Sequence, residues 1–250
     1  MSAPRLCAVV PTYNHWRALP DVLARLRAEG LAVFIIDDGS AEPARAAIAA
    51  LAAPRDGVVV LRHEANQGKG AAVLTGFARA GAAGFSHALQ VDADGQHDLS
   101  VLAGLLATAR RHPEALVCGA PIYDASAPAA RRIGRQVTRF WVAVETLCLG
   151  LPDSMCGLRV YPLAAVGRLT ERVRLGRRME FDTEILVRLV RDGAPLAVVP
   201  VAVRYDAANQ SNFALFADNW RISRMHARLV LELPWYAARL LAHRPVVLHA

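Results

Sequence analysis

The stretch that organises this chain is Asp92-Ala93-Asp94-Gly95-Gln96-His97-Asp98. It follows an apolar run, residues 85–91, whose length and flanking glycines predict a buried strand. Two carboxylates one residue apart can converge on a small ion once the backbone turns, and Gly95 permits that turn. Carboxylate and amide oxygens suit Mg²⁺ or Mn²⁺, which proteins often share with substrate phosphates. We therefore predict a metal and diphosphate site here, against the alternative of an acidic surface turn.

The overall composition indicates a single soluble domain of 250 residues, with room for a C-terminal extension. Apolar residues make up 54% of the chain, which is ample for a core. The net charge is +7 and the sequence pI is about 9.8, so acidic partners such as nucleotide diphosphates or anionic lipid fit the chain. Arginine runs at 131–139 and 168–178 lack interleaved aromatic residues, and no nucleic-acid motif is present, so we do not predict nucleic-acid binding.

The cysteines and the N-terminus bear on localisation. The four cysteines show neither a Cys-x-x-Cys pair nor a zinc-finger spacing, which predicts reduced thiols in a cytoplasmic protein. Pro11 ends the first apolar run early, so no signal peptide is predicted. No apolar segment approaches the roughly 20 residues that span a bilayer. Any membrane association would then be peripheral, on the inner face of the cytoplasmic membrane.

Apolar runs alternate with helical patterns along most of the chain, which predicts an α/β fold with a three-layer, mainly parallel sheet. Three polar clusters, residues 11–14, 37–40 and 92–98, each follow a predicted strand. In open α/β sheets ligands bind at that edge, so we expect these clusters to form one site. Strands are expected at 6–10, 32–36, 58–61, 85–91, 116–119 and 196–205, and helices at 16–29, 41–53, 66–80, 99–111, 131–149 and 181–191.

Residues 218–243 carry an apolar stripe and a basic stripe at helical spacing. Pro234 should break or kink this helix. Two interpretations stay open: a helix that packs on the domain with its arginines in water, or an interfacial helix on an anionic leaflet. The two stripes are Ile222, Met225, Leu229 and Leu233, and Arg221, Arg224 and Arg228.

Several short motifs follow one another along the chain: Pro11-Thr12-Tyr13-Asn14, Asp37-Asp38-Gly39-Ser40, Asn66-Gln67-Gly68-Lys69-Gly70, Asp92-Ala93-Asp94-Gly95-Gln96-His97, Asp153-Ser154-Met155-Cys156-Gly157-Leu158-Arg159, Phe181-Asp182-Thr183-Glu184, and Arg204 followed by Ser211-Asn212-Phe213. Taken together and in this order, these motifs resemble family 2 glycosyltransferases. The closer likeness is to the dolichyl-phosphate mannose synthase and polyprenyl-phosphate glycosyltransferase branch. The resemblance implies a GT-A fold over residues 1–215 with a helical extension over 216–250, and an inverting transfer of a hexose from a GDP- or UDP-linked sugar.

Roles follow from the resemblance by position. Metal binding falls to Asp92, Asp94 and Gln96, and Arg204 would reach the leaving diphosphate. The acceptor side would be formed by Arg132, Arg135 and Arg159. Lys69, in the glycine loop that opens a helix, is also assigned to the donor. The residues expected to hold the nucleotide sugar are Pro11, Thr12, Tyr13, Asp37, Asp38, Lys69 and Asp92.

One position departs from the branch. Its members usually have an arginine for the lipid phosphate where this chain has Pro121. Two kinds of acceptor therefore stay open. A lipid phosphate is already anionic, whereas a hydroxyl must give its proton to a carboxylate. Asp153 is the first candidate for that base, and the others are Glu180, Asp182 and Glu184. For Glu184 the competing interpretation is an ion pair with Arg188 on the helix surface.

Two other functions fit parts of the sequence. In a haloacid-dehalogenase-type phosphatase Asp92 would be the nucleophile and Asp94 the general acid. Such enzymes usually carry the pair on the first strand, with Thr or Val where Gln96 stands, so this fit is superficial. A catalytically silent, glycosyltransferase-like subunit on the membrane surface is the other alternative, and the intact Asp92/Asp94 pair argues against it.

Overall fold

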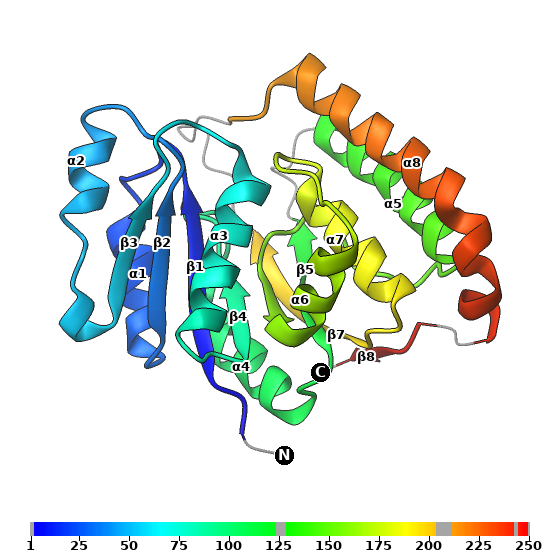
Figure 1. Ribbon diagram of the computed structural model, residues 1–250, viewed down its shortest axis with the longest axis horizontal. Helices are drawn as coiled ribbons and strands as arrows, with labels where there is room; N and C mark the ends of the chain where they lie inside the picture. The colour runs from blue at the N-terminus through cyan, green and yellow to red at the C-terminus, as the bar shows by residue number, and fades with distance from the viewer. Residues whose placement is uncertain (1–2, 124–128, 204–211, 243–244, 250) are drawn as a thin grey trace.

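The computed structural model describes residues 3–123, 129–203, 212–242 and 245–249. Its strands form one sheet in the order β3-β2-β1-β4-β6-β5-β7-β8 (Figure 1). All neighbouring strands in this order run parallel except β6, which is antiparallel to both β4 and β5. The strand bounds are β1 Leu6–Thr12, β2 Ala32–Asp37, β3 Val58–Arg62, β4 His87–Gln90, β5 Leu116–Tyr123, β6 Arg159–Pro162, β7 Leu196–Val203 and β8 Val247–His249.

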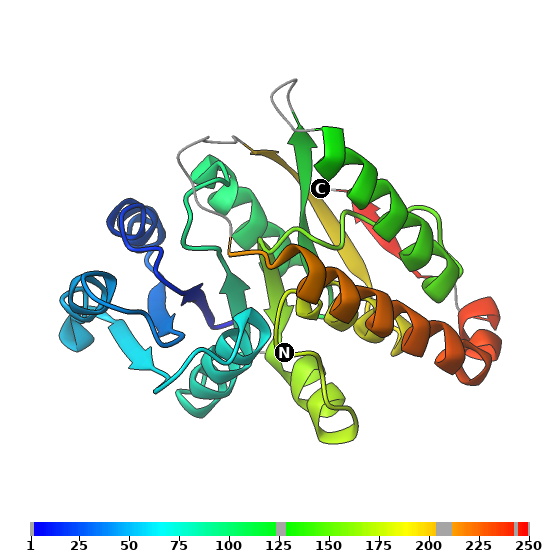
Figure 2. The same cartoon turned by 90° about the horizontal axis from the view of Figure 1, so that it is seen from above.

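Helices cover both faces of the sheet, which confirms the predicted three-layer α/β fold (Figure 2). One buried cluster joins the sheet to α3, α5, α6, α7 and α8, and the other joins its opposite face to α1, α2 and α4. The helix bounds are α1 Leu19–Ala28, α2 Ala44–Ala49, α3 Lys69–Ala82, α4 Leu102–Arg111, α5 Ala129–Thr146, α6 Leu163–Arg172, α7 Phe181–Arg191 and α8 Leu215–Ala242, with short 3-10 helices at Pro54–Asp56 and Leu99–Val101.

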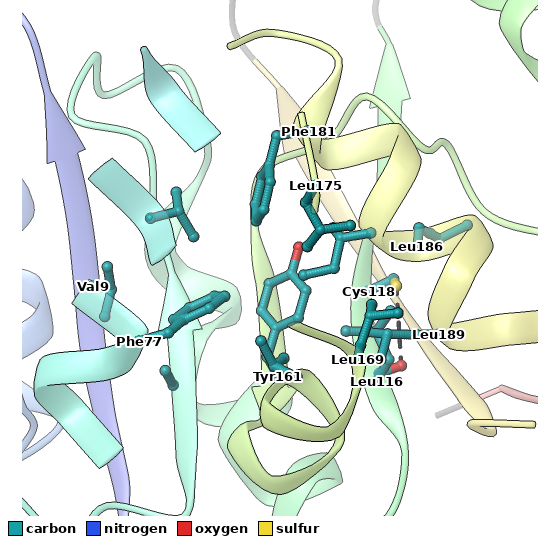
Figure 3. Close-up of a cluster of buried hydrophobic side chains, with 14 of the residues drawn as sticks. Val9, Phe77, Leu116, Cys118, Tyr161, Leu169, Leu175, Phe181, Leu186 and Leu189 are labelled. Carbon is teal, nitrogen blue, oxygen red and sulfur yellow. Dashed lines mark hydrogen bonds between the residues drawn. The ribbon is translucent and has the colours of Figure 1, made fainter. Parts of the chain in front are cut away.

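Strand β1 explains the two cores, because its apolar residues are continuous and alternate between the faces. Cys7 and Val9 point into the first cluster, while Ala8 and Val10 point into the second. On the first side the ring of Tyr161 packs 4.9 Å from that of Phe77, centroid to centroid (Figure 3). A strand buried on both faces must be apolar throughout, so the polar clusters can begin only where such strands end.

Strand β6 is the main departure from the predicted alternation. The sequence indicated a turn up to Arg159 and no strand beyond it, yet residues 159–162 insert between β4 and β5. The pairing sets Arg159 opposite Gln90, the last residue of β4. The segment that precedes β6 is thereby brought to the edge of the sheet where β4 delivers Asp92 and Asp94.

Helix α7 was predicted with one inward face and one face in water, and this was wrong. Every residue of Phe181–Arg191 is buried. The reason is that α3, α5, α6 and α8 all pack around it. Glu184 and Arg188 therefore do form the expected ion pair, with Arg188 Nε 2.7 Å from Glu184 Oε1, but the pair is buried rather than on a surface.

Helix α8 packs on the domain through its predicted apolar stripe, since Met225 and Leu229 are buried in the first core. It runs through Pro234 without ending, so the predicted break is absent. The strand β8 that follows pairs with β7 at the edge of the sheet. Within the ranges that the structure describes, no helix has both the length and the apolar character needed to cross a bilayer. The division of the chain at residue 215 stays a prediction.

We predict that Gly76→Ala in α3 destabilises the fold, because an added Cβ would lie 2.2 Å from Val9 Cγ1 in the packed core. The expected loss is about 1–3 kcal/mol in the free energy of unfolding. The control is Gly81→Ala in the same helix, where a Cβ meets nothing within 4 Å and the higher helix propensity of alanine should help slightly. Urea unfolding measures both, and equal midpoints for the two variants would contradict this account of the α3–β1 contact.

Candidate active site

The loop after β4 has the turn that the sequence predicted. Gly95 adopts a positive φ of 70°, and the backbone N–H of Gln96 donates to Asp94 Oδ1 at 3.0 Å. The loop is fastened to the end of β7, since His97 forms a bridge with Val203 and the Asp98 N–H donates to the Ala202 carbonyl at 3.0 Å. Asp92 and Asp94 are thus held at the carboxyl edge of the sheet.

Lys69, the first residue of α3, binds the first of these carboxylates. Its Nζ lies 2.7 Å from Asp92 Oδ1 and 2.8 Å from Asp182 Oδ2, so one ammonium is shared by two carboxylates. The other oxygen of Asp182 accepts from Gln90 Nε2 at 2.8 Å. The sequence did not predict this arrangement, although Asp182 stands in a quoted motif. Lys69 therefore contacts the metal-site carboxylate itself, and its assignment to the donor stays a prediction.

The local charges set the ionisation of these groups. Burial works against ionisation of Asp92, but the charge of Lys69, followed by those of His97 and Arg159, outweighs it and the pKa of Asp92 is lowered. The pKa of Asp94 is raised, by burial first and then by the nearby charge of Asp92. Burial alone would lower the pKa of Lys69, but the charges of Asp182 and Asp92 outweigh burial. The pKa is raised above its ordinary value and the ammonium stays charged. The surroundings therefore favour the charged form of Asp92 and oppose that of Asp94.

These donors fit a hard divalent cation. Asp92 and Asp94 supply carboxylate oxygens and Gln96 lies one residue past the turn, which matches the oxygen preference of Mg²⁺ and Mn²⁺. Among the residues that the structure describes, no three His, Cys, Asp or Glu side chains gather closely enough to hold a metal by themselves. The set is therefore suited to a cation whose coordination substrate oxygens complete.

The segment before β6 lies against Asp92 and Lys69. A Cβ added to Gly157 would lie 2.6 Å from Asp92 Oδ2 and 2.8 Å from Lys69 Nζ, so a side chain there would displace the charged ends of both residues. Cys156 Sγ lies 3.6 Å from Nε2 of His97, which gives that ring a partner other than a metal. The motif around Cys156 and the motif around Asp92 therefore meet in one site.

Arg159 was predicted to help shape the acceptor side of the site, and that role stays a prediction. The side chain is fully buried and donates to the main-chain carbonyls of Asp182 and Ser154, both at 2.6 Å. It also donates to the carbonyl of Asp153 at 3.3 Å. A buried guanidinium with these partners holds the loop in shape and cannot touch an acceptor in this arrangement.

Arg135 and Asp153 form an ion pair beside this loop, so an acceptor-side arginine meets the first candidate for a base. Asp153 also accepts from the Met155 N–H at 2.8 Å. Arg132 lies in α5, but its side chain is outside the part of the chain described, and Arg204 is outside the described residues altogether. The roles of all four in binding or catalysis stay predictions.

The other candidate bases are engaged within the protein. The carboxylate of Glu184 is fully buried and accepts from Gly176 N–H at 2.8 Å and from Arg188 and Arg228. Asp182 is held by Lys69 and Gln90 as described above. These contacts exclude Glu184 and Asp182 from the candidates for the general base that the sequence left open. Glu180 is buried just before α7, and one of its carboxylate oxygens, Oε2, has no hydrogen-bond partner among the described residues.

The two aspartates that close β2 are buried and bind neighbouring loops. Asp38 accepts from the Gln67 N–H at 2.9 Å and the Gly68 N–H at 2.7 Å, and its Oδ1 lies 2.7 Å from His63 Nδ1. Asp37 accepts from the Ser40 N–H at 2.9 Å and pairs with Arg62. Asp38 thus shapes the loop that leads into Lys69, and contact of either aspartate with a nucleoside stays a prediction.

The end of β1 lies beside these aspartates. Pro11 and Thr12 are buried, and Thr12 Oγ1 donates to the His15 carbonyl at 2.6 Å. Tyr13 is half-buried, and its carbonyl accepts from Asn212 Nδ2 at 2.9 Å. The first and last motifs of the chain therefore meet here, at the edge where the nucleotide was predicted.

Comparison with known proteins agrees with this geometry. The family model described as "Glycosyl transferase family 2" matches residues 7–159, more than half of the chain. A UDP-N-acetylglucosamine–dolichyl-phosphate N-acetylglucosaminyltransferase of Methanococcus voltae is 25% identical over 213 residues, which cover 79% of this chain and 84% of that protein. A polyprenol monophosphomannose synthase of Mycolicibacterium smegmatis is 26% identical over 213 residues, covering 79% of this chain and 76% of that one.

Solved structures share the fold at low identity. A glucosyl-3-phosphoglycerate synthase from Mycobacterium tuberculosis, solved with Mn²⁺, UDP-glucose and phosphoglyceric acid, superposes with a TM-score of 0.66 at 14% identity over 91% of this chain and 80% of that one. A mannosyltransferase from Pyrobaculum calidifontis, solved with GDP-mannose and Mn²⁺, gives a TM-score of 0.58 at 18% identity over 97% of this chain and 75% of that one. The three-layer sheet is thus the GT-A fold that the sequence motifs implied.

We predict that Asp38→Asn lowers the free energy of unfolding by about 1–3 kcal/mol, because the amide keeps one accepting oxygen and its NH2 group then faces the N–H of either Gln67 or Gly68. It should also raise the KM for the donor, since the same loop begins α3. Asp56→Asn, an exposed change of equal charge, is the control. A variant that unfolds at the wild-type midpoint while its donor KM rises would instead give Asp38 the direct nucleoside contact that the motif implied.

Proposed function

The chain belongs to glycosyl transferase family 2 and is a glycosyltransferase, and we propose that it moves a hexose, with inversion and with the help of a divalent metal, from a nucleotide-diphosphate sugar to a lipid-linked acceptor. The observation that carries this proposal is the Asp92/Asp94 pair at the carboxyl edge of the sheet, with Lys69 bound to Asp92. The phosphatase alternative is set aside, because the chain belongs to a glycosyltransferase family and its Asp92/Asp94 pair follows the fourth strand rather than the first. The silent-subunit alternative is set aside because the chain is an enzyme.

In the proposed reaction each residue near the pair has a task. Asp92 and Asp94, with Gln96, would hold the metal, which supplies stabilisation of the negative charge that builds on the leaving diphosphate. Lys69 keeps Asp92 ionised and fixed in position through its ammonium, which Asp182 shares. Arg204 would add a second cation on the diphosphate. Burial first, and then the charge of Asp92, raise the pKa of Asp94, and a cation bound there would offset both effects, which supports the metal assignment.

The donor would lie across the ends of β1 and β2. Pro11, Thr12, Tyr13, Asp37 and Asp38 surround that edge and would hold the base and ribose. A UDP- or a GDP-linked sugar both suit the proposal, because similar structures were solved with UDP-glucose and with GDP-mannose.

The acceptor assignment rests on relatives and on one ion pair. The Methanococcus relative is named for a dolichyl-phosphate acceptor, and a Micrococcus luteus relative, 26% identical over 206 residues, is named an undecaprenyl-phosphate mannosyltransferase. We propose a lipid-linked acceptor for this chain, with Arg135 and Arg132 on its side of the site. A phosphate would be drawn to Arg135, whereas a hydroxyl would need Asp153 as base.

Exposed aromatic side chains support work at a membrane surface. Phe140 on α5 is 61% exposed, and Phe216 and Trp220 on α8 are 88% and 71% exposed. Helices α5 and α8 run side by side (Figure 1). Of the arginines on α8 that were expected to face the leaflet, Arg221 pairs with Asp218 and Arg228 with Glu184. The proposed peripheral contact therefore relies more on aromatic insertion than on these charges.

A nucleotide-sugar panel read by thermal shift, with and without Mn²⁺, tests the donor. A ligand that binds the folded state raises the unfolding temperature by an amount set by its concentration over its dissociation constant. We expect a shift with one nucleotide sugar that grows when Mn²⁺ is added. No shift with any nucleotide sugar would contradict the proposal.

We predict that Asp94→Asn lowers the transfer rate by about 10²–10³-fold while the fold stays intact, because it removes a charge from the site that stabilises the leaving diphosphate. The steady-state rate measures this, and circular dichroism confirms folding. Asp56→Asn, exposed and distant in sequence, should keep the wild-type rate. Wild-type turnover in Asp94→Asn, or full activity of the unaltered enzyme in excess EDTA, would refute the metal role.

We predict that Phe216→Ser with Trp220→Ser weakens binding to lipid vesicles by at least about tenfold, since each large apolar side chain contributes roughly 1.5–3 kcal/mol when it leaves water. Co-sedimentation at high salt is the measurement, because salt screens the arginines and leaves apolar insertion. Val246→Ser is the control, as Val246 is 56% exposed and follows the opposite end of α8. Equal binding by both variants would leave α8 as a helix that only packs on the domain.

A further inference from the structure

A cavity lies away from the carboxylates of Asp92 and Asp94. Its volume is about 670 Å³, and its walls are the end of α6, the later half of α7 and the later half of α8. Arg188 in its wall lies six residues beyond Asp182 on α7, which places it about 9 Å further along that helix. This cavity is therefore distinct from the edge of the sheet where the donor is proposed to bind.

Four of the lining side chains are arginines, at positions 172, 174, 188 and 228, and a single lining residue, Glu232, is acidic. Arg188 is only 3% exposed, is paired with Glu184, and donates two hydrogen bonds to Glu232, at 2.9 and 3.2 Å. A buried charge costs free energy unless it is paired, and these two carboxylates supply that pairing for Arg188. The four arginines outnumber the three carboxylates that contact them, which are Glu184, Asp192 and Glu232.

The surplus charge is available to a ligand. Arg174 is exposed and makes no hydrogen bond or ion pair with any residue that the structure describes. Arg228 is half-exposed and binds Glu184 through one nitrogen, Nη2, which leaves its other nitrogens for a partner. Trp235, 80% exposed, stands at the rim and can cover an apolar group attached to the anion.

We propose that this cavity binds a phosphate ester, with Arg174 and Arg228 on the phosphate oxygens and Trp235 against the group that it carries. Guanidinium groups match the geometry of phosphate through paired N–H donors, and several that converge hold it better than single lysines would. The ester is either the headgroup of an anionic phospholipid in a bilayer or a soluble phosphate ester. The same residues would contact either one.

The test compares Arg174→Glu with Arg111→Glu. Both positions are exposed arginines and both changes alter the net charge equally, but only Arg174 lines the cavity. Arg174 has no partner among the described residues, so its replacement leaves the fold undisturbed. The probes are inorganic phosphate, read by calorimetric titration, and vesicles of equal parts phosphatidylglycerol and phosphatidylcholine, read by co-sedimentation. EDTA is present throughout, so that the metal site does not contribute.

We expect Arg174→Glu to weaken binding of at least one probe by about tenfold relative to Arg111→Glu, as loss of a charge-assisted hydrogen bond and reversal of one charge imply. An effect on vesicles alone identifies the phospholipid headgroup, and an effect on inorganic phosphate identifies a soluble ester. If both probes bind the two variants equally, or bind neither variant nor the wild type, the proposal is wrong. The donor panel of the proposed function is measured separately, so failure of one does not decide the other.

Discussion

The ammonium of Lys69, shared between the carboxylates of Asp92 and Asp182, is the interaction on which the rest of the site depends. Burying a carboxylate without a partner costs free energy. Without Lys69, the carboxylates of Asp92 and Asp182 would therefore repel each other or take up a proton. With it, the first turns of α3 and α7 are tied to the loop after β4. The oxygens of Asp92, which we propose as a metal ligand, are then held in position before any ligand arrives, which is the condition for electrostatic stabilisation without reorganisation.

The loop before β6 also comes close to Lys69 and its two carboxylates, and the antiparallel direction of β6 makes this approach possible. By pairing with β4, it turns the chain so that the preceding loop lies against Asp92 and Lys69, where a side chain in place of Gly157 would displace both charged groups. The buried guanidinium of Arg159 then binds the carbonyls of that loop and of Asp182. A parallel strand at this position would enter the sheet from the opposite edge.

The sequence predicted the first half of the fold well because its strands are continuously apolar and end in polar clusters, a pattern that needs no knowledge of neighbours. It did not predict β6, which is four residues long and contains Arg159 and Pro162. It placed Glu184 and Arg188 in water because their spacing is typical of a surface pair, whereas burial of α7 depends on helices distant in sequence. The partner of Lys69 was missed for the same reason, since Asp182 lies on another element. Contacts between distant segments are what local patterns cannot indicate.

The same packing narrows the chemistry of the acceptor. Asp182 and Glu184 resemble bases in the sequence, but each is already bound by cations that hold the fold together, and freeing either would leave a buried charge unpaired. Asp153 and Glu180 remain, and Asp153 is paired with Arg135. A phosphate acceptor would compete with Asp153 for that guanidinium, while a hydroxyl acceptor would compete with Arg135 for that carboxylate. The pair must open in either case, and which member the acceptor binds decides whether the enzyme needs a general base.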